Sequence, residues 1–184
     1  MANRAVFVDR DGTMARDVRY CRRPEDFELF PNTAKAIKLL SEHGFKVIVI
    51  TNQSGIARGY FTEETLAKIH DKMKRELAKE ETRVDAIYYC PHHPDDNCDC
   101  RKPRPKLVLQ AAEDYDIDLN QSFVVGDLQI DIELGKAVGC KTIFIGDSSS
   151  IDSEEAIPDC ISPDLLEAVR TILEWGDTVT AKNR

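Results

Sequence analysis

Thiol and imidazole side chains gather in one short stretch of this chain. Residues 90–100 read CPHHPDDNCDC and hold three of the six cysteines and two of the four histidines. The stretch could be a disulfide-bonded knot, a metal site or a surface loop with incidental thiols. Three thiolates and one imidazole are ligands that tetrahedral Zn²⁺ prefers. The candidate ligands are Cys90, His92, Cys98 and Cys100, with His93 as a spare.

The rest of the composition favours the metal interpretation. The chain has 184 residues, of which 42% are hydrophobic, and this length predicts a single domain over residues 1–184. The segment MANRAVFVDRDG lacks the apolar core of a signal peptide, and no apolar run approaches the ~18 residues that a membrane span needs. We therefore expect a cytoplasmic protein, in which thiols stay reduced. The cluster is interpreted as a structural zinc-binding loop over residues 90–103.

A second set of residues has the chemistry of phosphoryl transfer. Asp9 and Asp11 lie two residues apart in DRDGT, and Asp127 ends the apolar run SFVVGD. Carboxylates grouped in this way form an oxygen-rich pocket that suits Mg²⁺. An aspartate that faces a phosphorus atom can attack it as a nucleophile, and a second one can protonate the leaving oxygen and later activate water.

The apolar pattern predicts the elements that must position these side chains. Short apolar runs that end in polar residues predict buried parallel strands at residues 6–9, 46–52, 86–90, 122–127, 141–146 and 158–161. Amphipathic segments predict helices over residues 32–42, from Thr62 through Leu77, and over residues 105–115, 129–138 and 163–175. This alternation predicts an α/β fold with a doubly wound, mostly parallel sheet flanked by helices.

The polar residues follow successive strands of this sheet. Ligands bind outside the carboxyl ends of such strands, where we expect Asp9, Thr51, Asn52, Lys102 and Asp127 to converge. A hydroxyl, an amide and a lysine beside a divalent cation are the groups that stabilise a transferring phosphoryl group. The sequence therefore predicts a phosphoryl-transfer site at this edge.

Four motifs together resemble a known group of enzymes. DRDGT, TNQSGIARGYF, CPHHP…CDCRKPRP and VGD…D are similar to the haloacid dehalogenase (HAD) superfamily of phosphatases over residues 5–146. Within it they resemble the subgroup of heptose-bisphosphate and histidinol-phosphate phosphatases. The resemblance implies hydrolysis of a sugar phosphate through an aspartyl-phosphate, most closely the 7-phosphate of D-glycero-D-manno-heptose 1,7-bisphosphate. Histidinol phosphate is the alternative substrate, and a non-catalytic phosphosugar-binding zinc module is the alternative of another class.

The resemblance also implies a role for each matching residue. Asp9 would be the nucleophile and Asp11 the general acid and base, while Thr51 and Lys102 would stabilise the phosphoryl group. Mg²⁺ would be held by the carboxylates of Asp9 and Asp127 and by the backbone carbonyl of Asp11. Zinc would be held by Cys90, His92, Cys98 and Cys100, which favours His92 over His93. The substrate would be lined by Asp17, Arg19, Tyr20, Thr51, Asn52, Gln53, Ser54, Arg101 and Lys102.

Two positions depart from the pattern of the heptose enzymes. Leu128 stands where they commonly carry lysine after the motif aspartate, and Lys106 stands where they tend to have glycine. Zinc is expected to act as a brace that fixes the loop, so that the following Arg101 and Lys102 point into the site. Asp131 has two interpretations, one as a carboxylate that orients Lys102 or metal-bound water, and the other as an ordinary acid at a helix N-terminus.

Charge and spacing limit the partners. The net charge of −8 argues against nucleic acid and against an anionic membrane as partners, and we expect a monomer. About twenty residues separate the first motif from the first helix, too few for a large cap domain. Arginines in the segment 16–23 could bind a second phosphate or pair with nearby surface acids. His70 is assigned no function. Cys21, Cys140 and Cys160 are expected to be buried, with an exposed Cys21 among the arginines as the alternative.

Overall fold

Six parallel strands form one sheet in the computed structural model, which describes residues 2–151 and 156–181, with side chains through Trp175. The strand order is β3-β2-β1-β4-β5-β6, and every neighbouring pair is parallel. The predicted fold class is thus confirmed. The strands are β1 (Arg4–Val8), β2 (Phe45–Asn52), β3 (Ala86–Cys90), β4 (Phe123–Gly126), β5 (Lys141–Ile145) and β6 (Cys160–Ser162).

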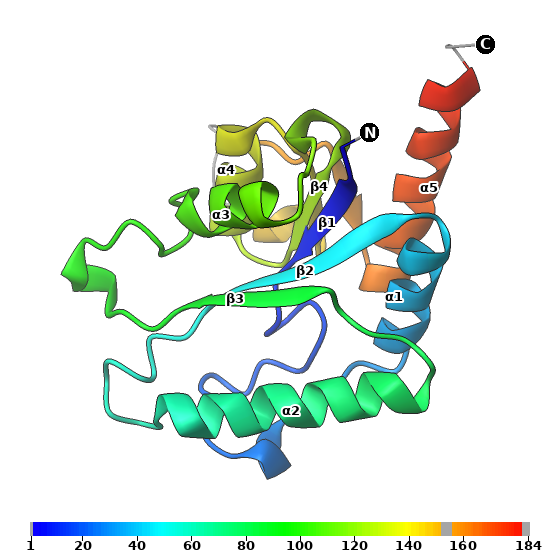
Figure 1. Cartoon of the computed structure of the whole chain (residues 1–184). Coiled ribbons are helices and arrows are strands. Elements are labelled where there is room, and N and C mark those ends of the chain that lie inside the picture. Colours follow the sequence, from blue (N-terminus) through cyan, green and yellow to red (C-terminus); the bar gives the residue numbers. More distant parts are fainter. Residues whose placement is uncertain (1, 152–155, 182–184) are drawn as a thin grey trace.

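Five α-helices cover the two faces of the sheet. Helices α3 and α4 lie on one side in Figure 1, and α1 and α5 pack against each other on the other side. The α-helices are α1 (Thr33–Glu42), α2 (Glu63–Lys79), α3 (Lys106–Asp114), α4 (Gln129–Val138) and α5 (Leu165–Ala181). Short 3₁₀ turns are η1 (Pro24–Asp26), η2 (Pro94–Asp96), η3 (Leu119–Gln121) and η4 (Ser148–Ser150).

The central strand β1 supplies both halves of the core. Val6 and Val8 point into the cluster that contains residues of α1, α2 and α5, whereas Ala5 and Phe7 point into the cluster of α3 and α4. Successive side chains of a strand face opposite sides, so a strand covered on both faces must be apolar throughout. The run AVFV meets this requirement and holds the first motif at a fully buried strand end.

The strand order places the first and fourth strand ends side by side. The chain winds outward from β1 through β2 to β3 and then crosses back to β4 on the other side of β1. Such a reversal opens a crevice at the carboxyl edge of the sheet, where doubly wound proteins bind ligands. Asp9 directly follows β1 and Asp127 directly follows β4, and the amide of Asp9 donates to the carbonyl of Val125. The topology therefore brings the two predicted metal ligands together.

Helix ends agree with the sequence only in part. Thr62, where the second helix was predicted to begin, caps α2, since its hydroxyl accepts from the amide of Thr65. Asn32 precedes α1, but its side chain makes no capping hydrogen bond. Helix α5 begins at Leu165 and runs six residues past the predicted end at Trp175, whose indole stacks on Phe123. Through this contact, Trp175 packs against the core.

The segment between β1 and α1 holds only the short turn η1, and this stretch is described throughout. The prediction that a large cap domain is absent is confirmed there. In the described residues, no helix combines the length and the apolar character that crossing a membrane requires.

Candidate active site

A buried lysine connects the predicted nucleophile to a second carboxylate. The Nζ atom of Lys102 lies 2.5 Å from Oδ1 of Asp9 and 2.7 Å from Oδ1 of Asp131, and it also donates to the carbonyl of Ile50 at 2.9 Å. The ammonium thus has three protein acceptors. Asp131 also accepts from the amide of Leu128 at the start of α4. Both interpretations of Asp131 therefore hold geometrically, because it caps the helix and orients Lys102.

The charges at this edge do not balance without a cation. Carboxylate oxygens of Asp9, Asp127 and Asp131 lie within 4.8 Å of one another. Three carboxylates and one ammonium have a net charge of about minus two, which one divalent cation would neutralise. Burial, together with neighbouring carboxylates, raises the pKa of Asp9 to about 8 despite Lys102, and burial and Asp131 raise the pKa of Asp127 to about 6. Burial alone would lower the pKa of Lys102, but Asp131 and Asp9 outweigh it and raise that pKa.

Local backbone chemistry holds Asp127 against the first motif. The hydroxyl of Thr13 donates to Oδ1 of Asp127 at 3.1 Å. A Cβ atom on Gly12 would lie 2.1 Å from Oδ2 of Asp127, and the φ of Gly12 is +90°. Only glycine tolerates both conditions. The glycine and threonine of DRDGT therefore seat the third carboxylate, and the oxygen-rich donor set that results fits Mg²⁺.

The side chain of Asp11 lies outside this carboxylate cluster. It accepts from Arg10 and from Nε2 of Gln53 at 2.9 Å, and Gln53 also donates to the hydroxyl of Thr51 at 2.8 Å. Arg10 is fully buried, which the sequence analysis did not anticipate. An arginine between two acidic residues reads as a surface residue, and only the packing of α2 over the motif reveals its burial.

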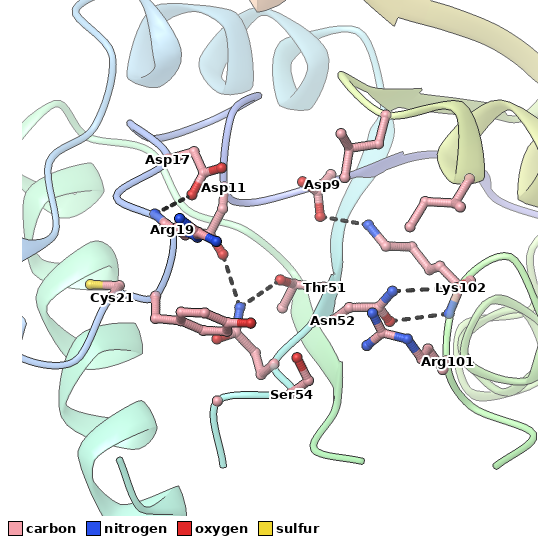
Figure 2. A pocket seen from close by; sticks show the side chains of 15 residues that line it. Asp9, Asp11, Asp17, Arg19, Cys21, Thr51, Asn52, Ser54, Arg101 and Lys102 are labelled. Carbon is pink, nitrogen blue, oxygen red and sulfur yellow. Dashed lines mark hydrogen bonds and ion pairs between the residues drawn. The ribbon is translucent and has the colours of Figure 1, made fainter. Parts of the chain in front are cut away.

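A cavity of about 180 Å³ joins these groups. Figure 2 shows Asp11, Asp17 and Arg19 on one side of it and Asn52, Arg101 and Lys102 on the other. All nine predicted substrate-lining residues border it. The lining is completed by residues that the sequence analysis did not assign to the substrate: Asp9, Asp11, Cys21, Gly55, Leu128 and Ile130.

The arginines of the segment 16–23 have different environments, and both earlier interpretations, surface pairing and a place near the substrate site, apply to some of them. Arg16 pairs with Glu28 and Arg23 pairs with Asp26 at the surface, whereas Arg19 lines the cavity. Arg22 lies over the ring of Tyr60. One arginine of the four, Arg19, therefore borders the cavity.

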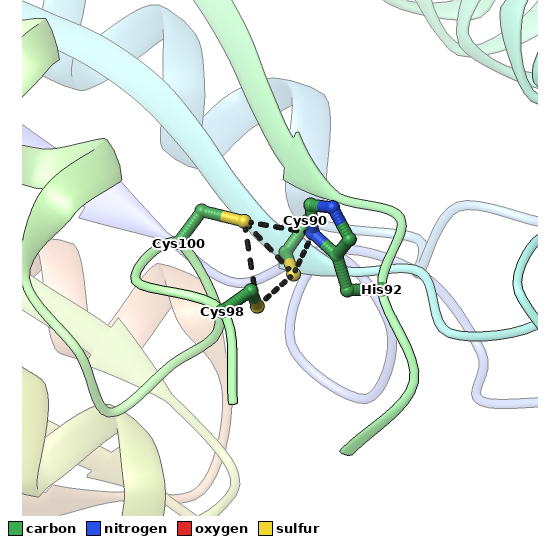
Figure 3. Close-up of side chains that lie close together, drawn as sticks. All are labelled: Cys90, His92, Cys98 and Cys100. Carbon is green, nitrogen blue, oxygen red and sulfur yellow. Dashed lines mark hydrogen bonds between the residues drawn. The ribbon is translucent and has the colours of Figure 1, made fainter. Parts of the chain in front are cut away.

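The four zinc-type ligand atoms converge to within 4.8 Å of one another. Sγ of Cys90 lies 3.5 Å from that of Cys98 and 3.2 Å from that of Cys100, and Nδ1 of His92 lies 3.2 Å from Sγ of Cys100 (Figure 3). A site with Zn–S distances of about 2.3 Å has ligand atoms roughly 3.5 to 3.8 Å apart. All six cysteines are free thiols, so the knot interpretation is wrong. His93 instead caps η2.

The metal-type loop is fastened to the catalytic edge through its backbone. The amide of Lys102 donates to Oδ1 of Asn52, and Nδ2 of Asn52 donates back to the carbonyl of Lys102. Arg104 donates to the backbone carbonyls of Asn97 and Cys98. The exposed side chain of Arg104 therefore links residues on the two sides of the metal-type loop's last turn through hydrogen bonds to its backbone.

The predicted burial of the other cysteines is correct for two of three. Cys21 and Cys140 are buried, while Cys160 is half-buried at the edge strand β6. His70, to which the sequence assigned no function, is also buried, and its ring contacts Arg10.

Comparison with known proteins supports the family that the sequence motifs resemble. A HAD-hydrolase-like family model matches residues 99–168. The chain is 34% identical over 180 residues to D-glycero-beta-D-manno-heptose-1,7-bisphosphate 7-phosphatase of Haemophilus influenzae, covering 92% of this chain and 97% of that protein. The chain belongs to the HAD-like heptose-bisphosphate phosphatase family. The corresponding enzyme of Chlorobaculum tepidum is 38% identical, covering 90% of this chain and 92% of that protein.

A solved structure of this family agrees in three dimensions. D,D-heptose 1,7-bisphosphate phosphatase from B. bronchiseptica, complexed with magnesium and phosphate, superposes with a TM-score of 0.85 at 35% identity. The alignment covers 93% of this chain and 98% of that one. Against this family, Leu128 is the departure that faces the site, since its half-exposed side chain lines the cavity, whereas Lys106 begins α3 with an exposed side chain.

Proposed function

We propose that the protein is a Mg²⁺-dependent phosphatase that removes the 7-phosphate of D-glycero-D-manno-heptose 1,7-bisphosphate. The observation that carries the proposal is the buried contact between Asp9 and Lys102, beside Asp127, in a chain of the heptose-bisphosphate phosphatase family. The cavity adds Arg19 and Arg101 for a second anionic group, and arginine is well suited to phosphate.

Asp9 and Asp11 have different roles in the proposed reaction: Asp9 supplies the attacking electron pair, and Asp11 transfers the protons. A carboxylate oxygen of Asp9 attacks phosphorus, the bond from phosphorus to the C7 oxygen breaks, and that oxygen takes a proton from Asp11. Water then attacks the aspartyl-phosphate, Asp11 takes a proton from that water, and the acyl phosphate bond breaks to regenerate Asp9. Thr51 and Lys102 stabilise charge on the phosphoryl oxygens. Asp17, Tyr20, Asn52, Gln53 and Ser54 shape the remaining substrate pocket.

Magnesium would be held by the carboxylates of Asp9 and Asp127 and the backbone carbonyl of Asp11, and when bound it would neutralise charge on the phosphoryl group. The raised pKa values of both carboxylates give a pH prediction. An acid with a raised pKa keeps its proton to higher pH, so metal and proton compete. Mg²⁺ should therefore bind at least about 10-fold more tightly at about pH 7.5 than at about pH 5.5, as measured by titration calorimetry. Affinity that does not change with pH would contradict this assignment.

Zinc, in this proposal, braces residues 90–103 and performs no chemistry. Replacing Cys100 with Ser should lower the zinc content from about one ion per chain to a small fraction and reduce kcat/KM by about 10-fold or more, because Lys102 follows two residues later. Zinc is measured by atomic emission. Cys160→Ser, a half-buried thiol outside the cluster, is the matched control and should retain both zinc and activity. Full activity in a variant shown to lack zinc would contradict the brace.

The substrate is tested by comparing phosphate release from both anomers of D-glycero-D-manno-heptose 1,7-bisphosphate with release from histidinol phosphate. We expect kcat/KM to favour a heptose bisphosphate by about 100-fold, because a second phosphate can pair with cavity arginines. A preference for histidinol phosphate would leave the proposed mechanism intact but would change the assigned substrate. The absence of turnover of any phosphate ester would favour the binding-module alternative.

The setting of the enzyme forms part of the proposal. We infer a single domain over residues 1–184 that acts as a monomer in the cytoplasm on a small phosphorylated sugar, without nucleic acid or membrane as a partner. The net charge of −8 supports the last point, and a Cys₃His metal site supports a reducing compartment.

A further inference from the structure

A buried positive charge lies directly behind Asp11. The side chain of Arg10 has no solvent exposure, whereas that of Asp11 is 25% exposed. Nη2 of Arg10 lies 2.8 Å from Oδ2 of Asp11, and Nε lies 3.1 Å from each carboxylate oxygen. In the described part of the chain, Asp11 is the carboxylate that pairs with this guanidinium. A buried guanidinium requires such a partner, so the pairing restricts the orientation of Asp11.

Helix α2 holds Arg10 in turn. Nη1 of Arg10 lies 3.1 Å from Nε2 of His70, which is buried on the inner face of α2. Arginine can only donate, so Nε2 accepts and the ring proton sits on Nδ1. Burial, reinforced by the charge of Arg10, lowers the pKa of His70 to about 3. The imidazole is therefore neutral and available as an acceptor.

Donors are distributed unequally over the two carboxylate oxygens of Asp11. Oδ2 receives both Nε and Nη2 of Arg10 and also Nε2 of Gln53, whereas Oδ1 receives only Nε of Arg10. An oxygen with three donors has little capacity to carry a further proton. Oδ1 retains that capacity, so the network selects one oxygen for proton transfer.

We propose that Arg10 and His70 are positioning residues that orient Asp11 so that its Oδ1 atom exchanges the proton with the leaving oxygen. The inference rests on the proposed phosphatase function and adds two residues that touch neither substrate nor phosphorus. It predicts a defect confined to steps that need proton transfer. A role in folding alone would affect all substrates equally.

The leaving group separates these two possibilities. The sugar oxygen of a heptose phosphate must be protonated as it leaves, whereas p-nitrophenolate leaves without a proton. We expect Arg10→Met to lower kcat/KM for the heptose bisphosphate, or for histidinol phosphate if the wild type prefers it, by about 100-fold. For p-nitrophenyl phosphate the decrease should stay below about 5-fold, since kcat/KM reports only the steps through release of the first product.

Matched variants keep the test decisive. Arg23→Met, at an exposed arginine paired with Asp26, should leave kcat/KM unchanged for both substrates. His70→Leu removes the acceptor for Arg10 and should reproduce the selective loss more weakly, while His70→Gln keeps an acceptor and should restore activity. The His70 pair decides the question if circular dichroism shows that Arg10→Met does not fold. Equal losses for both substrates in folded variants, or no loss, would overturn the proposal, whereas a wild type inactive on every ester would instead overturn the proposed function.

Discussion

Replacing Asp9 with Asn is expected to lower kcat/KM for phosphate release by about 10⁴-fold or more, with the fold intact. The amide cannot form the aspartyl-phosphate, and every later step depends on that bond. Asp9 is also one of three clustered carboxylates, so a neutral amide relieves repulsion rather than creating it. We therefore expect the melting temperature in the absence of Mg²⁺ to be maintained or raised.

The experiment needs steady-state kinetics with Mg²⁺ and a thermal melt without it. Asp71→Asn is the matched control, because Asp71 is an exposed residue of α2 outside the site. It should have wild-type activity. A substantial rate in Asp9→Asn, after contaminating phosphatase has been excluded, would show that another group attacks phosphorus.

Replacing Lys102 with Met should have the second-largest effect, a loss of about 10² to 10³-fold in kcat. Nζ of Lys102 is the cation that touches Asp9, and it is fixed by Asp131 and by the carbonyl of Ile50. Preorganised donors of this kind act on charge that develops in the transition state. The loss should therefore appear mainly in kcat rather than in KM.

Two controls accompany this variant. Lys106→Met removes an exposed lysine at the start of α3, four residues after Lys102, and should be nearly neutral. The zinc content of Lys102→Met should equal that of the wild type, which would show that the metal loop is intact and that the loss comes from the missing ammonium. A kcat within about 3-fold of wild type would contradict the role assigned to Lys102.

The sequence predicted those features that depend on local pattern. Apolar runs such as VFV and KVIVIT specify buried parallel strands, and their polar ends specify the edge where Asp9, Thr51 and Asp127 meet. The Cys₃His cluster could be predicted because cysteines rarely gather by chance. The position of Asp131 beside Lys102 was also anticipated, as one of two interpretations.

The remaining features depend on tertiary packing. The sequence gives no sign that Arg10 is buried, because its environment comes from His70 on α2, sixty residues away. The sequence likewise does not indicate that Arg104 reaches back to the loop carbonyls of Asn97 and Cys98. Trp175, where α5 was expected to end, stacks on Phe123, a contact between distant segments. Long-range partners of this kind cannot be derived from one-dimensional spacing.

The most direct test follows phosphorus by ³¹P NMR while the purified protein acts on D-glycero-D-manno-heptose 1,7-bisphosphate with Mg²⁺. The account predicts that the C7 phosphate resonance disappears, inorganic phosphate appears and the C1 phosphate remains, with no change in a sample that contains Asp9→Asn. Loss of the C1 phosphate, or an unchanged spectrum with active wild-type protein and Mg²⁺, would contradict it.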